Sequence, residues 1–404
     1  MVIVSTYPPE HCGVGRDAFQ LVQSLRALRE VRVVANRTGG PPLPDPLVFR
    51  GWWKDDWRYP FRIVSSVRAA DPDRTAVVHV MHHFFLYGGR RTVPLFPLLV
   101  FLLRLNGYRS VVQLQSVIDP RRIEPVSGLA LERWPPGIFP RLLRGFYRIL
   151  GRWSDGVVVC TRSMRDILVD EYHLNARRVW IVPVGWQLSQ AAPVPPLSGG
   201  DSPTSRKRAL VFHGFLDPTK GLEVLLRAFA LLVPDFPQLS LTFAGEVSPQ
   251  LGGDGPTFVE ALRQLARELH VEDRVRFTGY LDAAELDGLL RTAEIFVLPY
   301  TMRFSHGGSA SLSRLASTGK PLVASRISRF ADELHDGEDA LLVTAGSVGE
   351  LSAAIRRLLS NRELGARLGA RLRELASHRT WAASAAVLDR TVYPAVVERG
   401  ARPA

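Results

Sequence analysis

Short apolar runs alternate with amphipathic runs of helical period through the second half of the chain, and this alternation limits the possible folds most strongly. The apolar runs lie at 208–212, 240–244, 274–277, 295–298, 321–324 and 340–343. Strands that alternate with helices build a parallel sheet with helices on both faces. Glycines and Lys220 stand where several of these runs end, and an open parallel sheet binds ligands beyond the carboxyl ends of its strands.

The first half of the chain follows the same pattern. Its apolar runs lie at 2–6, 31–35, 76–80, 110–114, 156–160 and 179–182, with helical patterns between them, notably at 17–28 and 141–153. Residues 187–207 are rich in Pro, Gly and Ser and lack apolar periodicity, which is typical of a linker. The sequence therefore predicts an α/β fold with two Rossmann-like domains, 1–186 and 208–380, which face each other across a cleft. A further helical segment, 381–404, follows the second domain.

Composition restricts the class of protein. Of the 404 residues, 46% are hydrophobic and 22% are charged, which is typical of a globular protein. Cys12 and Cys160 are the only cysteines and fit no metal-ligand pattern, so we expect a reducing compartment and no disulfide framework. The chain opens with an apolar strand instead of a basic leader, and its longest apolar run is shorter than the roughly 20 residues of a spanning helix. We expect a cytoplasmic protein that is soluble or lies at the inner face of the membrane.

The net charge of +12 comes almost wholly from arginine. It fits a solvated basic surface, an anionic membrane or ligand, or nucleic acid; the last is disfavoured because no nucleic-acid-binding module is recognised. Within 140–153, arginines at 141, 144, 148 and 152 share one helical stripe. This segment is either a helix at a membrane surface or a packed helix with a solvated basic face.

Two loops have the chemistry of a ligand site. In 213–221, Lys220 and Gly221 lie beyond a strand and at the start of a helix, where free N–H groups and a lysine charge suit a diphosphate. The alternative is an ordinary surface lysine beside a turn glycine. In 305–309, a polar Ser-His-Gly-Gly-Ser loop precedes another helix, where glycines allow close backbone approach and Ser309 is a natural N-cap.

These motifs, in this order, resemble the nucleotide-sugar-binding half of the family 4 glycosyltransferases. TYPPEHCGVGRDAF (6–19), VHVMHHFFLYGG (78–89), IVPVGW (181–186) and DGEDALLV (336–343) extend the resemblance over nearly the whole chain. The resemblance implies the GT-B fold and a C-terminal helix that crosses back to the first domain. It also implies metal-independent transfer of a sugar, with retention, from a nucleotide diphosphate sugar to a polysaccharide, a glycolipid or a small glycoside. No cofactor is expected.

The resemblance and the two loops together give a set of candidate site residues. The candidate catalytic residues are Lys220, His82 and His306. The candidate donor-binding residues are Gly13, Gly15, Gly214, Lys220, Glu246, His306, Gly307, Gly308, Ser309 and Arg314. No metal site is predicted. The expected partners are the nucleotide-sugar donor, a glycan, lipid or small-molecule acceptor and, through 140–153, a membrane surface, but no nucleic acid.

The chain departs from the family pattern at several positions. The two glutamates of the family's Glu-x7-Glu motif fall on His306 and Arg314, a Gly-Arg pair is Gly214-Phe215, and a strand-end histidine is Gln115. These departures favour an alternative, a catalytically silent scaffold or binding subunit. A nucleotide-sugar epimerase on the same fold is a third possibility. A dinucleotide dehydrogenase is disfavoured, because no Gly-x-Gly-x-x-Gly opens a helix with an acid about 20 residues later.

Overall fold

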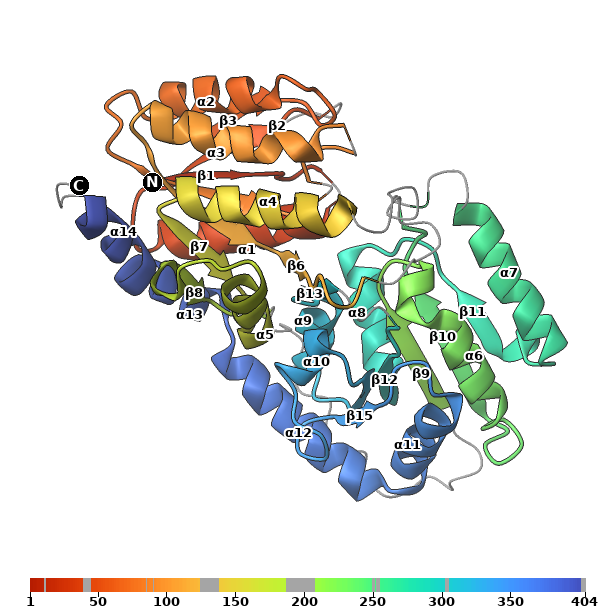
Figure 1. Cartoon of the computed structure of the whole chain (residues 1–404). Coiled ribbons are helices and arrows are strands. Elements are labelled where there is room, and N and C mark those ends of the chain that lie inside the picture. The colour runs from red at the N-terminus through yellow and green to blue at the C-terminus, as the bar shows by residue number, and fades with distance from the viewer. Residues whose placement is uncertain are drawn as a thin grey trace.

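The computed structural model describes residues 1–10, 12–38, 45–84, 86–89, 91–123, 138–186, 208–248, 251, 255–301 and 305–400. The predicted linker at 187–207 lies outside the described residues, as do 401–404. Two separate parallel sheets, each covered by helices, form the two halves of the molecule (Figure 1). They confirm the prediction of an α/β fold with two Rossmann-like domains.

The first domain is built on a seven-stranded parallel sheet. Its strand order is β3-β2-β1-β4-β5-β7-β8. The strands are β1 (Val2–Ser5), β2 (Arg32–Asn36), β3 (Val48–Trp52), β4 (Val77–His82), β5 (Arg109–Leu114), β7 (Gly156–Val159) and β8 (Val179–Ile181). Every residue of β4 is buried, because helices cover both faces of a central parallel strand.

The helices of the first domain pack around this sheet. They are α1 (Gly13–Arg26), α2 (Tyr59–Ala70), η1 (Val93–Leu95), α3 (Phe96–Leu105), α4 (Ile138–Trp153), α5 (Arg162–Asp166), η3 (Ile167–Glu171) and η4 (Ala176–Arg178). α2 packs on α3, and α3 packs on α4. α4 buries Leu143, Tyr147 and Leu150, so the basic stripe predicted in 140–153 belongs to a packed helix that leaves its arginines exposed.

The second domain repeats the design with a six-stranded parallel sheet in the order β11-β10-β9-β12-β14-β15. The strands are β9 (Arg208–His213), β10 (Leu239–Ala244), β11 (Val275–Phe277), β12 (Ile295–Leu298), β14 (Leu322–Ser325) and β15 (Leu341–Val343). The helices are η5 (Pro218–Lys220), α6 (Leu222–Ala230), α7 (Gly255–Glu268), η7 (Glu272–Arg274), α8 (Ala283–Thr292), α9 (Ala310–Ala316), α10 (Ser328–Ala331), α11 (Val348–Ser360) and α12 (Arg362–His378). Each domain has its own hydrophobic core.

A small antiparallel sheet joins the two domains. It pairs β6 (Ser116–Ile118) of the first domain with β13 (Ser305–Gly307) of the second. His306 lies opposite Val117, and Gly307 lies opposite Ser116. The two strands meet between the domains in Figure 1. We call this contact the junction sheet; it brings the candidate loop at 305–309 against the first domain.

The end of the chain returns to the first domain. After α12 the chain forms α13 (Trp381–Val387), η8 (Leu388–Val392) and α14 (Tyr393–Gly400), and α13 packs against α1. Leu388 and Tyr393 belong to the first domain's core. The Tyr393 hydroxyl lies 2.7 Å from His79 Nδ1. These helices lie beside the first domain in Figure 1, so the last helices of the chain pack on its first domain.

Candidate functional site

Lys220 is held in a tight loop beyond the carboxyl end of β9. Asp217 caps the short helix η5 and accepts a hydrogen bond from the Thr219 N–H at 2.9 Å. Gly221 follows with φ of 66°, and a side chain there would collide with the Pro299 carbonyl oxygen. The Lys220 Nζ lies 4.2 Å from the centre of the Tyr300 ring and 3.9 Å from Asp217 Oδ2. Ring and carboxylate therefore fix the ammonium group in place.

Gly214 and Glu246 meet at the carboxyl ends of β9 and β10. Gly214 has φ of 143° and donates its N–H to the Ala244 carbonyl oxygen at 3.0 Å. The Leu216 N–H donates to the Glu246 carbonyl oxygen at 2.8 Å. A Cβ on Gly245 would collide with the Gly214 carbonyl. The structure thus brings these two candidates together through the backbone, and their role in donor binding stays a prediction.

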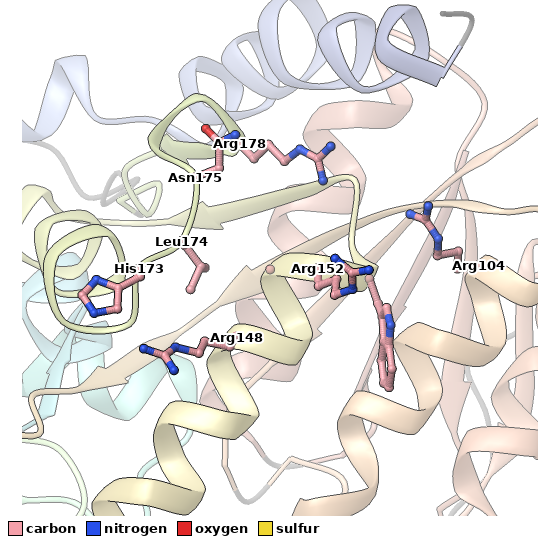
Figure 2. A pocket seen from close by; sticks show the side chains of 9 residues that line it. Arg104, Arg148, Arg152, His173, Leu174, Asn175 and Arg178 are labelled. Atoms are coloured by element: carbon pink, nitrogen blue, oxygen red, sulfur yellow. The ribbon is translucent and has the colours of Figure 1, made fainter. Parts of the chain in front are cut away.

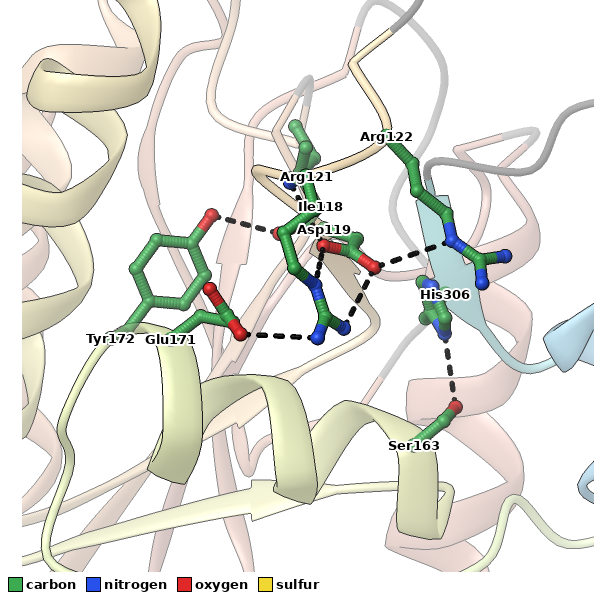
Figure 3. A network of polar contacts seen from close by, with 8 residues as sticks. All are labelled: Ile118, Asp119, Arg121, Arg122, Ser163, Glu171, Tyr172 and His306. Carbon is green, nitrogen blue, oxygen red and sulfur yellow. Dashed lines mark hydrogen bonds and ion pairs between the residues drawn. The ribbon is translucent and has the colours of Figure 1, made fainter.

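His306 connects the two domains. Its Nδ1 lies 3.0 Å from the Ser163 hydroxyl of the first domain (Figure 3). The Ser163 N–H donates to Asp332 of the second domain at 3.1 Å. Burial lowers the pKa of His306, while the charges of Asp119 and Asp332 act in the opposite direction. A histidine at a family glutamate position therefore forms part of the contact between the domains.

Asp119 is the anionic centre of the same contact. Its carboxylate lies 3.0 Å from the Arg121 guanidinium and 3.8 Å from that of Arg122 (Figure 3). Burial raises the pKa of Asp119, but the hydrogen bonds from Arg121, the Arg121 charge and the His306 charge together outweigh it and lower this pKa. Asp119 therefore stays ionised beside the imidazole.

The glycines of the 305–309 loop serve the contact between the domains. A Cβ on Gly307 would lie 2.5 Å from the Gln115 carbonyl oxygen, and one on Gly308 would lie 2.9 Å from Val184 Cγ2. The first domain thus fills the space that a side chain would take at either glycine, and the donor-binding role of Gly307 and Gly308 stays a prediction. Ser309 is an N-cap as predicted, and its hydroxyl accepts the Leu312 N–H at 3.2 Å.

Arg314 is engaged with a carboxylate of its own domain. It lies in α9 and forms an ion pair with Asp287 of α8. His213, at the end of β9, has a pKa lowered to about 4 by burial, and the charges of Arg314 and Arg16 act in the same direction. Arg16 belongs to α1 of the first domain, so the start of α1 approaches the carboxyl end of the second sheet.

Gly13 and Gly15 lie at that start of α1. Gly15 is buried, and a Cβ there would lie 3.3 Å from Thr6 Oγ1, whereas Gly13 has open space around it. Gly15 thus lets the helix pass close to the end of β1. Neither glycine has a shown ligand contact, and their donor-binding role stays a prediction.

His82 lies inside the first domain. The centre of its ring is 4.1 Å from that of Phe96 and 5.4 Å from that of Phe146. Burial lowers its pKa to about 3. Its proposed catalytic role stays a prediction, but the structure encloses the ring among aromatic side chains.

His83, which sequence reasoning did not select, is the histidine that faces the second domain. Its pKa is lowered to about 4 by burial and then by the charges of Arg329, Lys220 and Lys54. Arg329 and Lys220 belong to the second domain. The only signal in the sequence is its position, because His83 is the first residue after β4, and ligands bind beyond the carboxyl ends of parallel strands.

Two further features of the described residues concern metal binding and membrane crossing. Among the described residues, no group of three or more His, Cys, Asp or Glu side chains is arranged to hold a metal ion. In the same part of the chain, every helix is too short or too polar to cross a membrane.

Comparison with known sequences gives matches to both halves of the chain. The family model described as glycosyl transferases group 1 matches residues 201–375, and that described as glycosyltransferase family 4 matches 12–190. The chain is 30% identical over 221 residues to a D-inositol 3-phosphate glycosyltransferase of Geodermatophilus obscurus, which covers 52% of the chain and 47% of the relative. A D-inositol 3-phosphate glycosyltransferase of Acidothermus cellulolyticus is 31% identical over 216 residues, which cover 51% of this chain and 46% of the relative. The chain thus spans about half the length of the curated relatives it matches.

Solved structures show a similar fold over the whole chain. Sucrose-phosphate synthase from Thermosynechococcus elongatus superposes with a TM-score of 0.77 at 19% identity, covering 98% of this chain and 99% of the other. Anabaena Alr3699/HepE in complex with UDP-glucose superposes with a TM-score of 0.69 at 14% identity, covering 97% and 99%. At these identities the likeness establishes the two-domain architecture.

Proposed function

The chain belongs to the family 4 glycosyltransferases of the GT-B fold, and we propose that it transfers a sugar from a nucleotide diphosphate sugar to an acceptor hydroxyl. One observation carries the proposal: cationic groups of both domains converge on His83, at the carboxyl end of β4. Anabaena Alr3699/HepE, which has the same fold, is known in complex with UDP and with UDP-glucose. That supports a nucleotide-sugar donor for this chain.

The proposed reaction releases a nucleoside diphosphate, on which negative charge grows as the bond to the sugar breaks. Arg329 and Lys220 from the second domain and Lys54 from the first are the cations whose charges lower the pKa of His83. Fixed positive charges of this kind stabilise such a leaving group because they need not reorganise during the reaction. Transfer with retention and without a metal is part of the proposal and rests on the family resemblance.

His83 is suited to contact an uncharged part of the substrates. With a pKa of about 4 its imidazole is neutral near pH 7, and a neutral imidazole both donates and accepts a hydrogen bond. A sugar hydroxyl of the donor or the acceptor fits this chemistry. The acceptor is proposed to be a polysaccharide, a glycolipid or a small glycoside.

A catalytically silent scaffold is the second candidate, and a specific observation favours it. The two residues at the family's glutamate positions are both engaged within the protein: His306 with Ser163, and Arg314 with Asp287. The chain has no carboxylate at either position, and these contacts hold both replacement side chains within the protein. A scaffold would bind a nucleotide but release no sugar.

Calorimetric titration of the purified protein with UDP, GDP, ADP and TDP tests the donor site. We expect one nucleotide to bind, and Lys220→Ala to weaken that binding roughly 10- to 100-fold, since a charged hydrogen bond contributes about 1.5–3 kcal/mol. Arg276→Ala is a matched control, because Arg276 is exposed on β11 of the same domain. Absence of binding by all four nucleotides would contradict the proposal.

Product analysis with the corresponding sugar nucleotides separates the three functions. A transferase forms product only when an acceptor is added, and an epimerase alters the donor sugar without one. Nucleotide binding with neither reaction would identify the scaffold.

A further inference from the structure

The outer side of the first domain holds a cavity of about 560 Å³ that includes none of the candidate donor-site residues. It lies between the end of α3, the end of α4 and the segment that leads into η4 (Figure 2). Four arginines line it, and they come from three elements: Arg104 from α3, Arg148 and Arg152 from α4, and Arg178 from η4. His173 and Trp153 complete the polar and aromatic lining.

No counter-charge is built into this arginine pocket. Its lining contains no aspartate or glutamate, and within the described ranges none of its four guanidinium groups forms an ion pair. Some other arginines of the chain are paired, as Arg208 is with Glu294 at 2.6 Å. Four like charges around one cavity repel each other, and a bound anion removes that repulsion. The guanidinium fork matches the geometry of a phosphate group.

The helices around the pocket extend its positive charge over a whole face. α2, α3 and α4 pack side by side on the first sheet. These three helices contain no aspartate or glutamate, and every side chain in them that is charged near pH 7 is an arginine. The arginines are Arg62, Arg68, Arg104, Arg141, Arg144, Arg148 and Arg152. Such a face attracts an anionic surface at long range.

Large apolar side chains stand exposed among these arginines. Leu105, next to Arg104, is 70% exposed, and Leu142, next to Arg141, is 50% exposed. Phe101 and Ile149 are also exposed on the same two helices. A soluble phosphate would gain nothing from exposed leucines, whereas a bilayer interface takes up apolar side chains while its anionic headgroups bind the arginines. The occupant that fits both features is an anionic phospholipid.

We propose that the α3–α4 face docks on the surface of an anionic phospholipid bilayer, with one headgroup phosphate bound in the arginine pocket. The docking is independent of donor binding, because all lining residues belong to the first domain and lie outside the candidate donor site. It specifies the membrane contact expected from 140–153 by naming the face, the lipid charge and the residues that hold the phosphate.

Co-sedimentation of the full chain with vesicles tests the proposal. We expect binding to equimolar phosphatidylcholine and phosphatidylglycerol, little binding to phosphatidylcholine alone, and weakening with salt. R148Q combined with R152Q should lower the partition coefficient roughly 25-fold, since each arginine near an anionic surface contributes about fivefold. R362Q combined with R367Q removes the same charge from exposed positions of α12 and should leave binding unchanged.

Two controls decide between the outcomes. Equal losses in the two double variants would mean that net charge, and not the arginine pocket, drives binding, and would overturn the proposal. Calorimetric titration with glycerol 1-phosphate tests a soluble ligand: saturable binding of this ester without any vesicle binding would also overturn it. Nucleotide binding by R148Q/R152Q should equal that of the unmodified protein, so a failed docking experiment is distinguishable from a failed donor site.

Discussion

At the scale of the residue, two adjacent histidines have different surroundings. His82 ends β4 and lies among phenylalanine rings. His83 follows it and lies among cations of both domains. Both pKa values are lowered, chiefly by burial, so both imidazoles are neutral near pH 7. Only His83 is placed to meet a ligand that bridges the domains.

Substitution separates the two histidines. His83→Ala should weaken binding of the preferred nucleotide sugar about fivefold, because one neutral hydrogen bond contributes about 1 kcal/mol. His82→Leu should leave that affinity unchanged, since the ring is enclosed within the first domain. Calorimetric titration of both variants provides the measurement. Weaker binding in His82→Leu with unchanged binding in His83→Ala would instead support the catalytic role predicted for His82.

At the scale of the element, the junction sheet consists of two three-residue strands, and glycine makes it possible. Gly307 in β13 lies opposite Ser116 in β6, where a Cβ would crowd the Gln115 carbonyl oxygen. Backbone atoms cannot move aside as a flexible side chain can. The residue type at 307 therefore decides whether the strands can pair at this distance.

Gly307→Val should disrupt the junction sheet and leave both domain cores folded. We expect a loss of about 1–3 kcal/mol from overpacking, confined to the contact between the domains. Hydrogen exchange measures it: the amides of β6 and β13 should exchange faster, while those of β1 and β9 keep their protection. Gly349→Ala is the control, because a Cβ there meets no atom within 4 Å. Unchanged exchange in β6 and β13 would contradict the inference.

The sequence predicted those strands and helices well that are marked by an apolar run or by a regular spacing of apolar residues. Long apolar runs such as 76–80 and 240–244 coincide with β4 and β10. β6 and β13 were missed because each pairs with a strand of the other domain, and such a pairing leaves no local pattern in the sequence. The arginine pocket was found only in part: the stripe on α4 follows helical spacing, but Arg104 and Arg178 join it through tertiary packing.

At the scale of the whole molecule, the chain closes its first domain with its last helices. Leu388 and Tyr393 are buried, together with Trp381, Ala385, Val392 and Val396, in a core whose remaining members precede residue 185. Tyr393 also contacts His79, which lies 2.8 Å from the Gln113 side chain. The first domain is therefore completed only after the second has been synthesised.

Leu388→Ala should destabilise the first domain selectively. Truncating a fully buried leucine costs about 2–5 kcal/mol, and Leu388 is 1% exposed within the first core. Hydrogen exchange should rise in β1 and β4 more than in β9 and β12. Leu231→Ala is the control, because Leu231 is more than half exposed on the second domain. Equal effects on both sheets would show that the C-terminal helices stabilise the molecule as one unit.

Opposing groups set the pH dependence of the whole fold. Burial lowers the pKa of five histidines: His79, His82, His83, His213 and His306. Each is neutral in the fold and gains a proton on unfolding below its ordinary pKa of 6.5, so its stabilisation is complete above that pH and is lost on acidification. Burial raises the pKa of Asp17 and Glu333 to about 7. These acids are protonated in the fold at low pH, so their stabilisation is lost as the pH rises through about 7.

The balance predicts maximal stability near pH 7 and a steep loss below it. Near pH 5.5, unfolding takes up roughly four protons on His79, His82, His83 and His213 and releases roughly two from the acids, so stability falls by about 3 kcal/mol per pH unit. His306 adds to this fall in the same direction. Urea unfolding between pH 5 and 8 measures this slope. Glu333→Gln removes one opposing group and should steepen the acid side by about 1 kcal/mol per pH unit. An unchanged slope would mean that Glu333 is ionised in the fold through its ion pair with Arg379 at 3.2 Å, and that this pair outweighs the cost of burying the carboxylate.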